Sequence, residues 1–497
     1  MELFLSAVLS DLASRSINFI FNKCSKLPSP AVEDSLQRAL LRAQVIVDES
    51  MRRHITNQAM LQQLNMLRDT MHQGNYMLDI FRCKPDDDEE EEDTKHKIVS
   101  HPLLLNSRVN CVRDFLSSRT SAQILKEMQQ VLDRLSSMIH DANELVLFLA
   151  SYPPMYRQPY SMHLLLGNCM FGRQMEAQLA INFLLHTRTH GAEELEVLPI
   201  VGPYQVGKRT LVAHVCKDER VRDYFSEIVL WTDDHEFRDE KITIPREGHE
   251  NIFQNCAPNK EGRILVIVEL AADFNEVVWK RLYSASKRCL PSGSKIIVTS
   301  QSDKVVKYGT TRALTLNYMS QEEYWYFFKI LTFGSVDPEM HPRLTQMAME
   351  ISRMHNCCFI AAHLVSYLLR DNFDIHFWHK VLIFLKEYIQ NHVSKFGEGP
   401  FDDRNQSKPV HLQRMATPSE VIMVSNPSDR SSQEEVPKIR LDDVIYKNVR
   451  PHGKFEALVW RSQIPPYYSY TTTCEIQELK NTGTKRKRTM KSGVTFC

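Results

Sequence analysis

Long apolar runs are absent from this 497-residue sequence, and so is an excess of charge of either sign. No run reaches the ~18–20 apolar residues that a membrane-spanning helix needs, so the sequence predicts no membrane span. Lysine and arginine together number 61, as do aspartate and glutamate, and the formal net charge is zero. This balance favours no highly charged partner on bulk electrostatic grounds.

Paired cysteines are also missing. The eleven cysteines include no CxxC pair and follow no regular spacing, which indicates free thiols in a reducing compartment rather than a disulfide framework. The adjacent Cys357 and Cys358 are interpreted as buried small apolar residues rather than ligands. The N-terminal stretch MELFLSAVLSDLASRSINFIF lacks the basic start of a signal peptide, and Asp11 interrupts it, so it is interpreted as an amphipathic helix.

A basic cluster, TKRKRTMK, stands at residues 484–491. It matches a nuclear-import signal or, alternatively, a solvated tail, and the sequence leaves both interpretations open. The nearby Tyr467, Tyr468 and Tyr470 do not alternate with the basic residues as a base-stacking platform would. We therefore expect a cytoplasmic protein, with nuclear access left open, and no nucleic-acid partner.

Residues 1–150 have the periodicity of amphipathic helices. In the stretch SRTSAQILKEMQQVLDRLSSMIHDANELVLFL, one apolar stripe is formed by Leu125, Met128, Val131, Leu132, Leu135, Met138 and Ile139. A helix cannot bury such a stripe alone, so this region is predicted to form a helical bundle of the coiled-coil type. The acidic run DDDEEEED, residues 86–93, is interpreted as a solvated loop between helices; the alternative is that it binds a basic partner.

The pattern changes in residues 165–318. Four short runs are rich in isoleucine and valine and do not alternate with polar residues; they are LEVLPIVG, EIVLWT, RILVIVEL and SKIIVTS. Runs of this kind are typical of buried parallel strands, and the spacers between them are long enough for helices. This region is therefore predicted to be an α/β domain with a parallel sheet, like that of P-loop nucleotide-binding proteins.

Helical patterns return in residues 319–395, where Ser320 and Glu323 make a capping box for the stretch QEEYWYFFKILTF. This region is predicted to be a small helical subdomain. Residues 396–440 are polar and broken by glycine and proline, so they are predicted to be a linker, and residues 441–497 remain an unassigned C-terminal segment. The predicted fold class is thus mixed: helical bundle, α/β domain with a parallel sheet, helical subdomain and a poorly defined tail.

A glycine loop follows the first predicted strand of the α/β domain. The candidate phosphate-binding residues are Gly202, Pro203, Tyr204, Gln205, Val206, Gly207, Lys208, Arg209 and Thr210. The N–H groups of such a loop surround phosphate oxygens, and the helix that follows adds partial positive charge. The lysine reaches the terminal phosphates. The spacing of Gly202, Gly207 and Lys208 therefore predicts a nucleotide-binding loop, with an α/β domain that carries a coincidental glycine turn as the alternative.

The residues that would hold magnesium fit this loop less well. Magnesium loops place a serine or threonine directly after the lysine, but here Arg209 stands there and Thr210 comes one residue late. A guanidinium has no lone pair for a metal, although it can neutralise phosphate charge directly. Glu269, at the end of the third strand, is the candidate metal ligand, and Leu270 takes the place of a second carboxylate. The sequence thus does not favour magnesium or hydrolysis.

Several of these segments resemble plant NB-ARC disease-resistance proteins of the coiled-coil type, over most of residues 1 to about 390. GPYQVGKRTL looks like their phosphate loop. MFGRQMEAQLAINFLL, with Gly172 and Arg173, resembles the segment that opens the nucleotide domain and borders the adenine. LNMLRDTMHQGNYMLDIFR is similar to the helix that carries their acidic motif, of which Asp79 remains.

Other family positions depart from the pattern. GSKIIVTSQ is similar to the strand that ends in a phosphate-sensing arginine, but the position is Gln301. CCFI stands where the family has Gly-Leu-Pro-Leu, so Phe359 takes the place of the proline. A winged-helix subdomain with its Met-His-Asp motif and leucine-rich repeats are not found in the remaining residues, so the resemblance implies a truncated family member.

The resemblance implies a function in defence signalling, with ADP or ATP as the ligand. We expect adenine-nucleotide binding without hydrolysis, and a role as truncated receptor, adaptor or decoy. Its expected partners are proteins that bind the N-terminal helices, including other immune receptors or a second copy. Two alternatives stay open: an interaction scaffold that has lost the nucleotide, and a working P-loop ATPase. A bundle whose apolar stripes are all buried internally would bind none of these partners.

Overall fold

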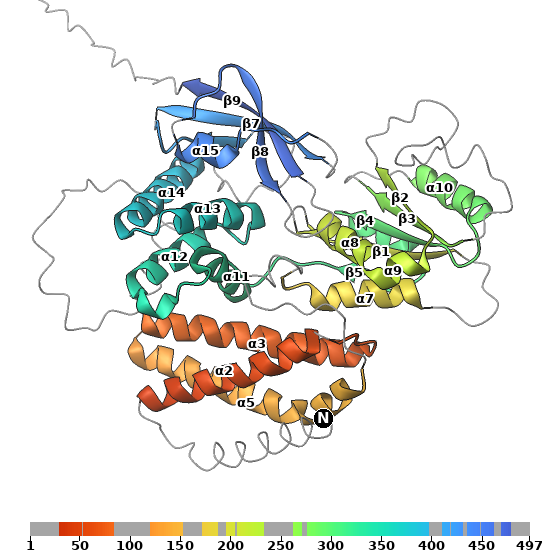
Figure 1. The fold of residues 1–497 in the computed structure, drawn as a ribbon, viewed down its shortest axis with the longest axis horizontal. Coiled ribbons are helices and arrows are strands. Elements are labelled where there is room, and N and C mark those ends of the chain that lie inside the picture. Colours follow the sequence, from red (N-terminus) through yellow and green to blue (C-terminus); the bar gives the residue numbers. More distant parts are fainter. Residues whose placement is uncertain are drawn as a thin grey trace, which may run out of the picture. The chain divides into compact units, whose positions relative to one another are not determined.

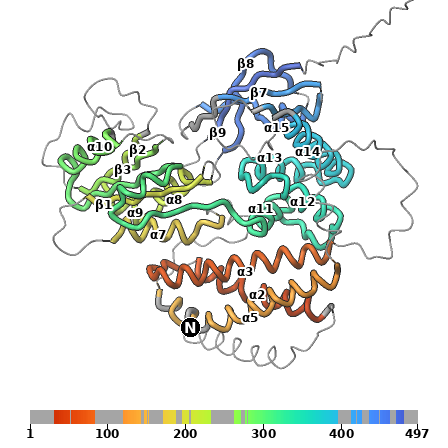
Figure 2. The backbone as a smooth tube through the Cα atoms, turned by 180° about the vertical axis from the view of Figure 1, so that it is seen from behind, coloured from red at the N-terminus to blue at the C-terminus, as the bar shows by residue number. Residues whose placement is uncertain are grey.

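The computed structural model describes thirteen stretches of the chain: residues 29–51, 53–83, 120–152, 171–186, 195–203, 206–232, 262–270, 276–396, 410–417, 419–430, 435–447, 449–461 and 469–478. The chain divides into two compact units, the first made of residues 1–405 and 460–468 and the second of residues 406–459 and 469–497. Figures 1 and 2 show their elements from opposite sides. The acidic run at 86–93 and the basic cluster at 484–491 lie outside the described residues.

The first unit begins with three helices that pack on one another: α2 (Ser29–Met51), α3 (Gln58–Arg82) and α5 (Ser121–Ser151). Thr120 starts α5 with a reciprocal capping box, in which its side chain and that of Gln123 each accept a backbone N–H. The predicted stripe of α5 faces inward, with Met128 and Leu135 fully buried. Burial of these stripes is what makes the three helices stable together.

The α/β domain has five described parallel strands in the order β2-β3-β4-β1-β5. They are β1 (Glu196–Val201), β2 (Glu227–Thr232), β3 (Ile264–Glu269), β4 (Lys295–Ser300) and β5 (Leu314–Thr315). On one face lie α7 (Gln174–Leu185), α8 (Lys208–Lys217) and α9 (Glu219–Tyr224). On the other lies α10 (Glu276–Cys289), while η1 (Asp303–Tyr308) follows β4. The four strands predicted from the sequence thus form a sheet buried on both faces.

A helical subdomain completes the first unit. Its described elements are α11 (Gln321–Phe333), η2 (Pro338–Met340), α12 (Pro342–Met354), α13 (Phe359–Asp371) and α14 (Ile375–Phe396). The Ser320 side chain accepts the backbone N–H of Glu323 and so caps α11, which is one half of the predicted capping box. Two of the largest fully buried side chains, Trp325 of α11 and Trp378 of α14, belong to this subdomain.

The second unit contains a four-stranded sheet in the order β6-β7-β9-β8 and one short helix. Its elements are β6 (Val410–Gln413), β7 (Glu420–Arg430), α15 (Leu441–Tyr446), β8 (Lys454–Arg461) and β9 (Ser469–Glu478). The strand β7 pairs antiparallel with both β6 and β9. Two strands, β6 and β7, thus lie within residues 396–440, where the sequence predicts a linker. The apolar run at residues 421–424 of β7 was a local signal for a strand, although polar residues and proline surround it.

The predicted fold class is confirmed: N-terminal helices, a parallel sheet of the P-loop type and a helical region follow one another along the chain. No helix among the described residues has the length and apolar character needed to span a bilayer.

Candidate functional site

The glycine loop joins β1 to α8, as the sequence predicts. Gly207 lies directly before α8 with φ of 94°, a left-handed conformation that favours glycine. Gly202 is needed for another reason, since a Cβ atom there would lie 2.4 Å from the backbone oxygen of Leu316. Val206 is buried against the core, whereas Tyr204 and Gln205 lie outside the described residues. Both glycines thus have a structural reason to be glycine.

Lys208 folds back onto the loop. Its Nζ donates to the backbone oxygens of Gly202 at 2.7 Å and Pro203 at 2.8 Å. Burial lowers the pKa of Lys208 to about 8, and the nearby Glu269 carboxylate acts in the opposite direction. The ammonium group therefore lies at the loop beside weak neutral acceptors, where an anionic ligand would be a stronger partner.

Arg209 pairs with the candidate metal ligand. Its Nη2 lies 2.5 Å and its Nε 2.8 Å from the same Oε2 atom of Glu269. Glu269 ends β3, whereas Arg209 lies in the first turn of α8, which follows β1. The strand β4 lies between β3 and β1 in the sheet. The long arginine side chain spans that gap, with half of its side-chain surface exposed, whereas Glu269 is 11% exposed.

These residues do not fit a bound magnesium ion. The carboxylate that would ligate the ion is already neutralised by a guanidinium, and Arg209 itself offers only donors. Leu270, at the second carboxylate position, is buried and apolar. Nowhere among the described residues do three or more histidine, cysteine, aspartate or glutamate side chains gather as a metal site.

Gly172 and Arg173 lie before α7, away from the loop in sequence. Gly172 has φ of 68°, and a Cβ atom there would lie 2.5 Å from Oε1 of Glu323. Arg173 is buried, donates to the backbone oxygen of Asn317 and pairs with Glu176 at 3.3 Å. Arg68, from α3 of the bundle, donates to Gln174 at 2.5 Å and to the Gly172 backbone oxygen at 3.4 Å. These contacts tie the segment to both α3 and the residues before α11.

Five charged side chains meet at this point, which we call the junction cluster: Arg68, Asp69, Arg173, Glu176 and Glu323. Burial raises the pKa of Glu323 to about 7; Asp69 and Glu176 act in the same direction, and Arg68 and Arg173 against it. Its Oε1 is buried and accepts no hydrogen bond from the described residues. The ionised form of Glu323 is therefore unfavourable in the folded protein.

Replacing Glu323 with glutamine is expected to stabilise the protein at high pH only. The pKa of Glu323 is raised above its ordinary value of 4.5, so the folded state binds more protons than the unfolded state between pH 4.5 and 7. The wild type therefore loses stability over that window, by at most about 3 kcal/mol, and Glu323→Gln does not. Thermal unfolding at pH 5 and pH 8 measures this, with Glu322→Gln as the control. Equal shifts at both pH values would contradict it.

Gln301 and Phe359, the two positions that depart from the family pattern after β3, lie in different parts of the fold. Gln301 directly follows β4, between the ends of β3 and β1, and places an amide where the family has an arginine. Phe359 begins α13 and packs edge-on against Phe327 of α11, with ring centroids 5.5 Å apart. Phe327 also contacts Phe171, at 5.2 Å. Phe359 is thus part of an aromatic cluster with α11.

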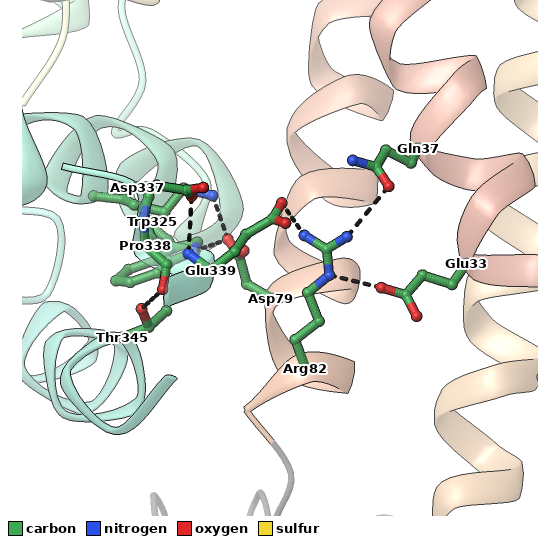
Figure 3. A network of polar contacts seen from close by, with 10 residues as sticks. Glu33, Gln37, Asp79, Arg82, Trp325, Asp337, Pro338, Glu339 and Thr345 are labelled. Carbon is green, nitrogen blue, oxygen red and sulfur yellow. Dashed lines mark hydrogen bonds and ion pairs between the residues drawn. The ribbon is translucent and has the colours of Figure 1, made fainter. Parts of the chain in front are cut away.

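A second polar network, shown in Figure 3, was not predicted from the sequence. Asp79 of α3 is buried, and its Oδ2 accepts from Trp325 Nε1 at 2.8 Å and pairs with Lys329 Nζ at 2.5 Å. Arg82 pairs with Glu33 of α2 at 2.7 Å and with Glu339 of η2. A sequence signal existed, because Asp79 stands between Leu78 and Ile80 in a buried stretch of α3. Its partners are about 250 residues away and give no local signal.

The sequence was compared with known proteins. No protein-family model matches it. It is 23% identical to disease resistance protein RGA2 of Solanum bulbocastanum, over 74% of this chain and 37% of that protein. Putative disease resistance protein RGA1 of the same species is 21% identical, over 76% of this chain and 38% of that protein. The putative disease resistance RPP13-like protein 1 of Arabidopsis thaliana is 24% identical, over 76% and 37%.

The chain spans less than two fifths of the length of these curated relatives. The matches cover about three quarters of the chain. Along the chain, the helices of the bundle come first, and the parallel sheet with its glycine loop follows. The resemblance predicted from the sequence is therefore confirmed, and the chain is homologous to plant disease resistance proteins.

Proposed function

We propose that this chain is an adenine-nucleotide-binding protein of the NB-ARC type that holds ADP at the loop from Gly202 to Thr210. The observation that carries the proposal is the loop itself. Gly207 turns the backbone into α8, so the first N–H groups of that helix face the loop. Lys208 lies across the loop on two carbonyl oxygens, and a diphosphate would offer it a charged partner instead.

We propose further that the bound nucleotide is not hydrolysed. Hydrolysis by P-loop proteins uses magnesium and a residue that orients the attacking water. Arg209 and Glu269 are paired with each other, and Leu270 has no group that could orient water. The side chains at this site therefore support binding of the nucleotide without its hydrolysis.

The biological role we propose is in plant defence, since the relatives are described as disease resistance proteins. In this proposal the chain acts in defence signalling as a receptor, adaptor or decoy, and its partners bind the N-terminal helices. Leu41 and Val45 on α2 are large apolar side chains that are more than half exposed among the described residues. They are the part of the bundle where we expect other proteins, including other immune receptors, to bind.

An interaction scaffold without nucleotide is the second candidate. It is favoured by the same lysine contacts, because Lys208 already has two backbone acceptors. The two functions differ in whether ADP stabilises the protein. A ligand present at 100 times its dissociation constant raises the free energy of unfolding by about 2.7 kcal/mol, and a scaffold would show no rise.

Isothermal titration with ADP tests the proposed function. The wild type is expected to bind, and Lys208→Ala to bind about 10- to 100-fold more weakly, because one charged hydrogen-bonding group is lost. Lys217→Ala is the matched control, since Lys217 is exposed at the end of the same helix. Identical null heat traces for the wild type and Lys208→Ala would leave only the scaffold. In a separate assay with ATP, phosphate release by the wild type above that of Lys208→Ala would show an ATPase.

A further inference from the structure

Arg209 and Glu269 form a close ion pair at the edge of the sheet where parallel strands end. Nε and Nη2 of Arg209 both approach the same oxygen of Glu269, at 2.8 and 2.5 Å. Glu269 is mostly buried, and Arg209 is half exposed. The carboxylate therefore fixes the guanidinium beside the start of α8, next to Lys208, while the guanidinium still reaches solvent.

The charges at this edge differ from those of a magnesium-dependent loop. Such a loop combines one lysine with a divalent ion and its oxygen ligands. Here two cations lie close together, Lys208 and Arg209; Glu269 pairs with Arg209 and acts electrostatically on Lys208. A nucleoside diphosphate brings several negative charges, and guanidinium groups bind phosphate oxygens through fixed, paired N–H donors.

Magnesium and Arg209 compete for the same carboxylate. A magnesium ion binds oxygen ligands at about 2.0–2.1 Å, and the Nη2 atom already lies 2.5 Å from Glu269 Oε2. A divalent ion at that oxygen would lie against the guanidinium, and like charges this close repel strongly. The ion could bind this oxygen only after the pair opened, which would leave Arg209 without its acceptor.

We propose that Arg209 takes the place of magnesium in this protein, so that the loop binds the metal-free nucleoside diphosphate in preference to its magnesium complex. This inference rests on the proposed nucleotide binding and adds the chemical form of the ligand. Glu269 acts as a positioning residue that holds the guanidinium and does not ligate a metal. The side chain that follows Lys208 therefore selects between the two forms of ADP.

Calorimetric titration with ADP, once in excess EDTA and once in excess MgCl₂, tests the preference on the full chain. The wild type is expected to bind at least about tenfold more tightly in EDTA, the effect of one strong charged contact. In Arg209→Thr the order is expected to reverse, because a hydroxyl group and a free carboxylate then stand where magnesium loops have them. Glu269→Gln is expected to keep the preference for EDTA, since the amide carries no charge for magnesium.

A direct metal readout accompanies the titration. Manganese(II) serves as a magnesium substitute, and its electron paramagnetic resonance signal in the presence of ADP reports ion bound to the protein. Protein-bound manganese is expected for Arg209→Thr and not for the wild type. If Arg209→Thr fails to fold, Arg209→Lys replaces it, because lysine keeps the charge but lacks the two-pronged contact; its preference for EDTA is expected to be reduced.

The outcomes separate the two proposals. Wild-type binding that is equal or tighter in MgCl₂, or manganese bound to the wild type, overturns the role of Arg209 and leaves nucleotide binding standing. Absence of wild-type binding in both buffers overturns the proposed nucleotide binding itself, and the preference with it.

Discussion

Replacing Asp79 with alanine is expected to destabilise the contact between α3 and α11 by about 3–5 kcal/mol. Asp79 is buried, and its carboxylate accepts from Trp325 and pairs with Lys329. Alanine would leave a fully buried indole N–H and a mostly buried ammonium without that acceptor, and removing one partner of a buried pair is far more costly than losing an exposed pair. Native-state hydrogen exchange, read from peptides of α3 and α11, measures the loss as faster exchange.

Glu339→Ala is the matched control for this prediction. Glu339 pairs with Arg82 on the same side of α3, but half of its side chain is exposed, so its loss is expected to cost at most about 1 kcal/mol. A double-mutant cycle of Asp79→Ala with Lys329→Met isolates the ion pair from the hydrogen bond to Trp325. Equal exchange rates in Asp79→Ala and Glu339→Ala would refute the role assigned to Asp79.

Replacing Arg414 with alanine is expected to unfold the second unit and leave the first folded. Arg414 is fully buried, pairs with Glu420 and donates to the backbone oxygens of Val444 and Val449 at 2.9 and 3.0 Å. It thereby joins the end of β6, the start of β7 and the chain around α15. Its loss is expected to cost about 3–5 kcal/mol, a large share of the ~5–15 kcal/mol that stabilises a typical domain.

Hydrogen exchange again provides the measurement, because it reports each unit separately. Peptides of β7 and β9 are expected to lose protection in Arg414→Ala, and peptides of α3 and α5 to keep it. Arg450→Ala is the matched control: it pairs with the same Glu420 carboxylate at 2.6 Å, but 56% of its side chain is exposed, so little change is expected. If both variants behaved alike, Arg414 would not be the residue that joins these elements.

The strands of the first unit could be predicted because burial on both faces leaves a continuous apolar run in the sequence. The strand β5 has only two residues, Leu314 and Thr315, too few for any periodic pattern. In the second unit, β7 and β9 pair across about 50 residues and carry polar side chains such as Thr472 and Thr473. The apolar run at residues 421–424 marks β7 locally, but its pairing with β9 leaves no local pattern in the sequence.

The candidate site shows the same limit. The spacing of Gly202, Gly207 and Lys208 was enough to predict the loop. The two glycines are required by the local backbone, and the lysine stands at the position typical of phosphate-binding loops. The pairing of Arg209 with Glu269 depends on the strand order, because it joins the start of α8 to the end of β3 across β4. From the sequence, Arg209 was an unsuitable metal ligand that could neutralise phosphate charge, and Glu269 was a candidate metal ligand.

Helix α3 holds contacts at several points along its length. Arg68 binds the segment before α7, Asp79 binds α11, and Tyr76 accepts from Arg353 of α12 at 2.6 Å. A protein that bound this side of α3 would have to displace contacts made by the same chain. Because these contacts are intramolecular, their effective concentration stays high at any dilution of the protein. Such a competitor would therefore bind the isolated bundle much more tightly than the whole protein, and the difference in affinity would equal the cost of releasing α3.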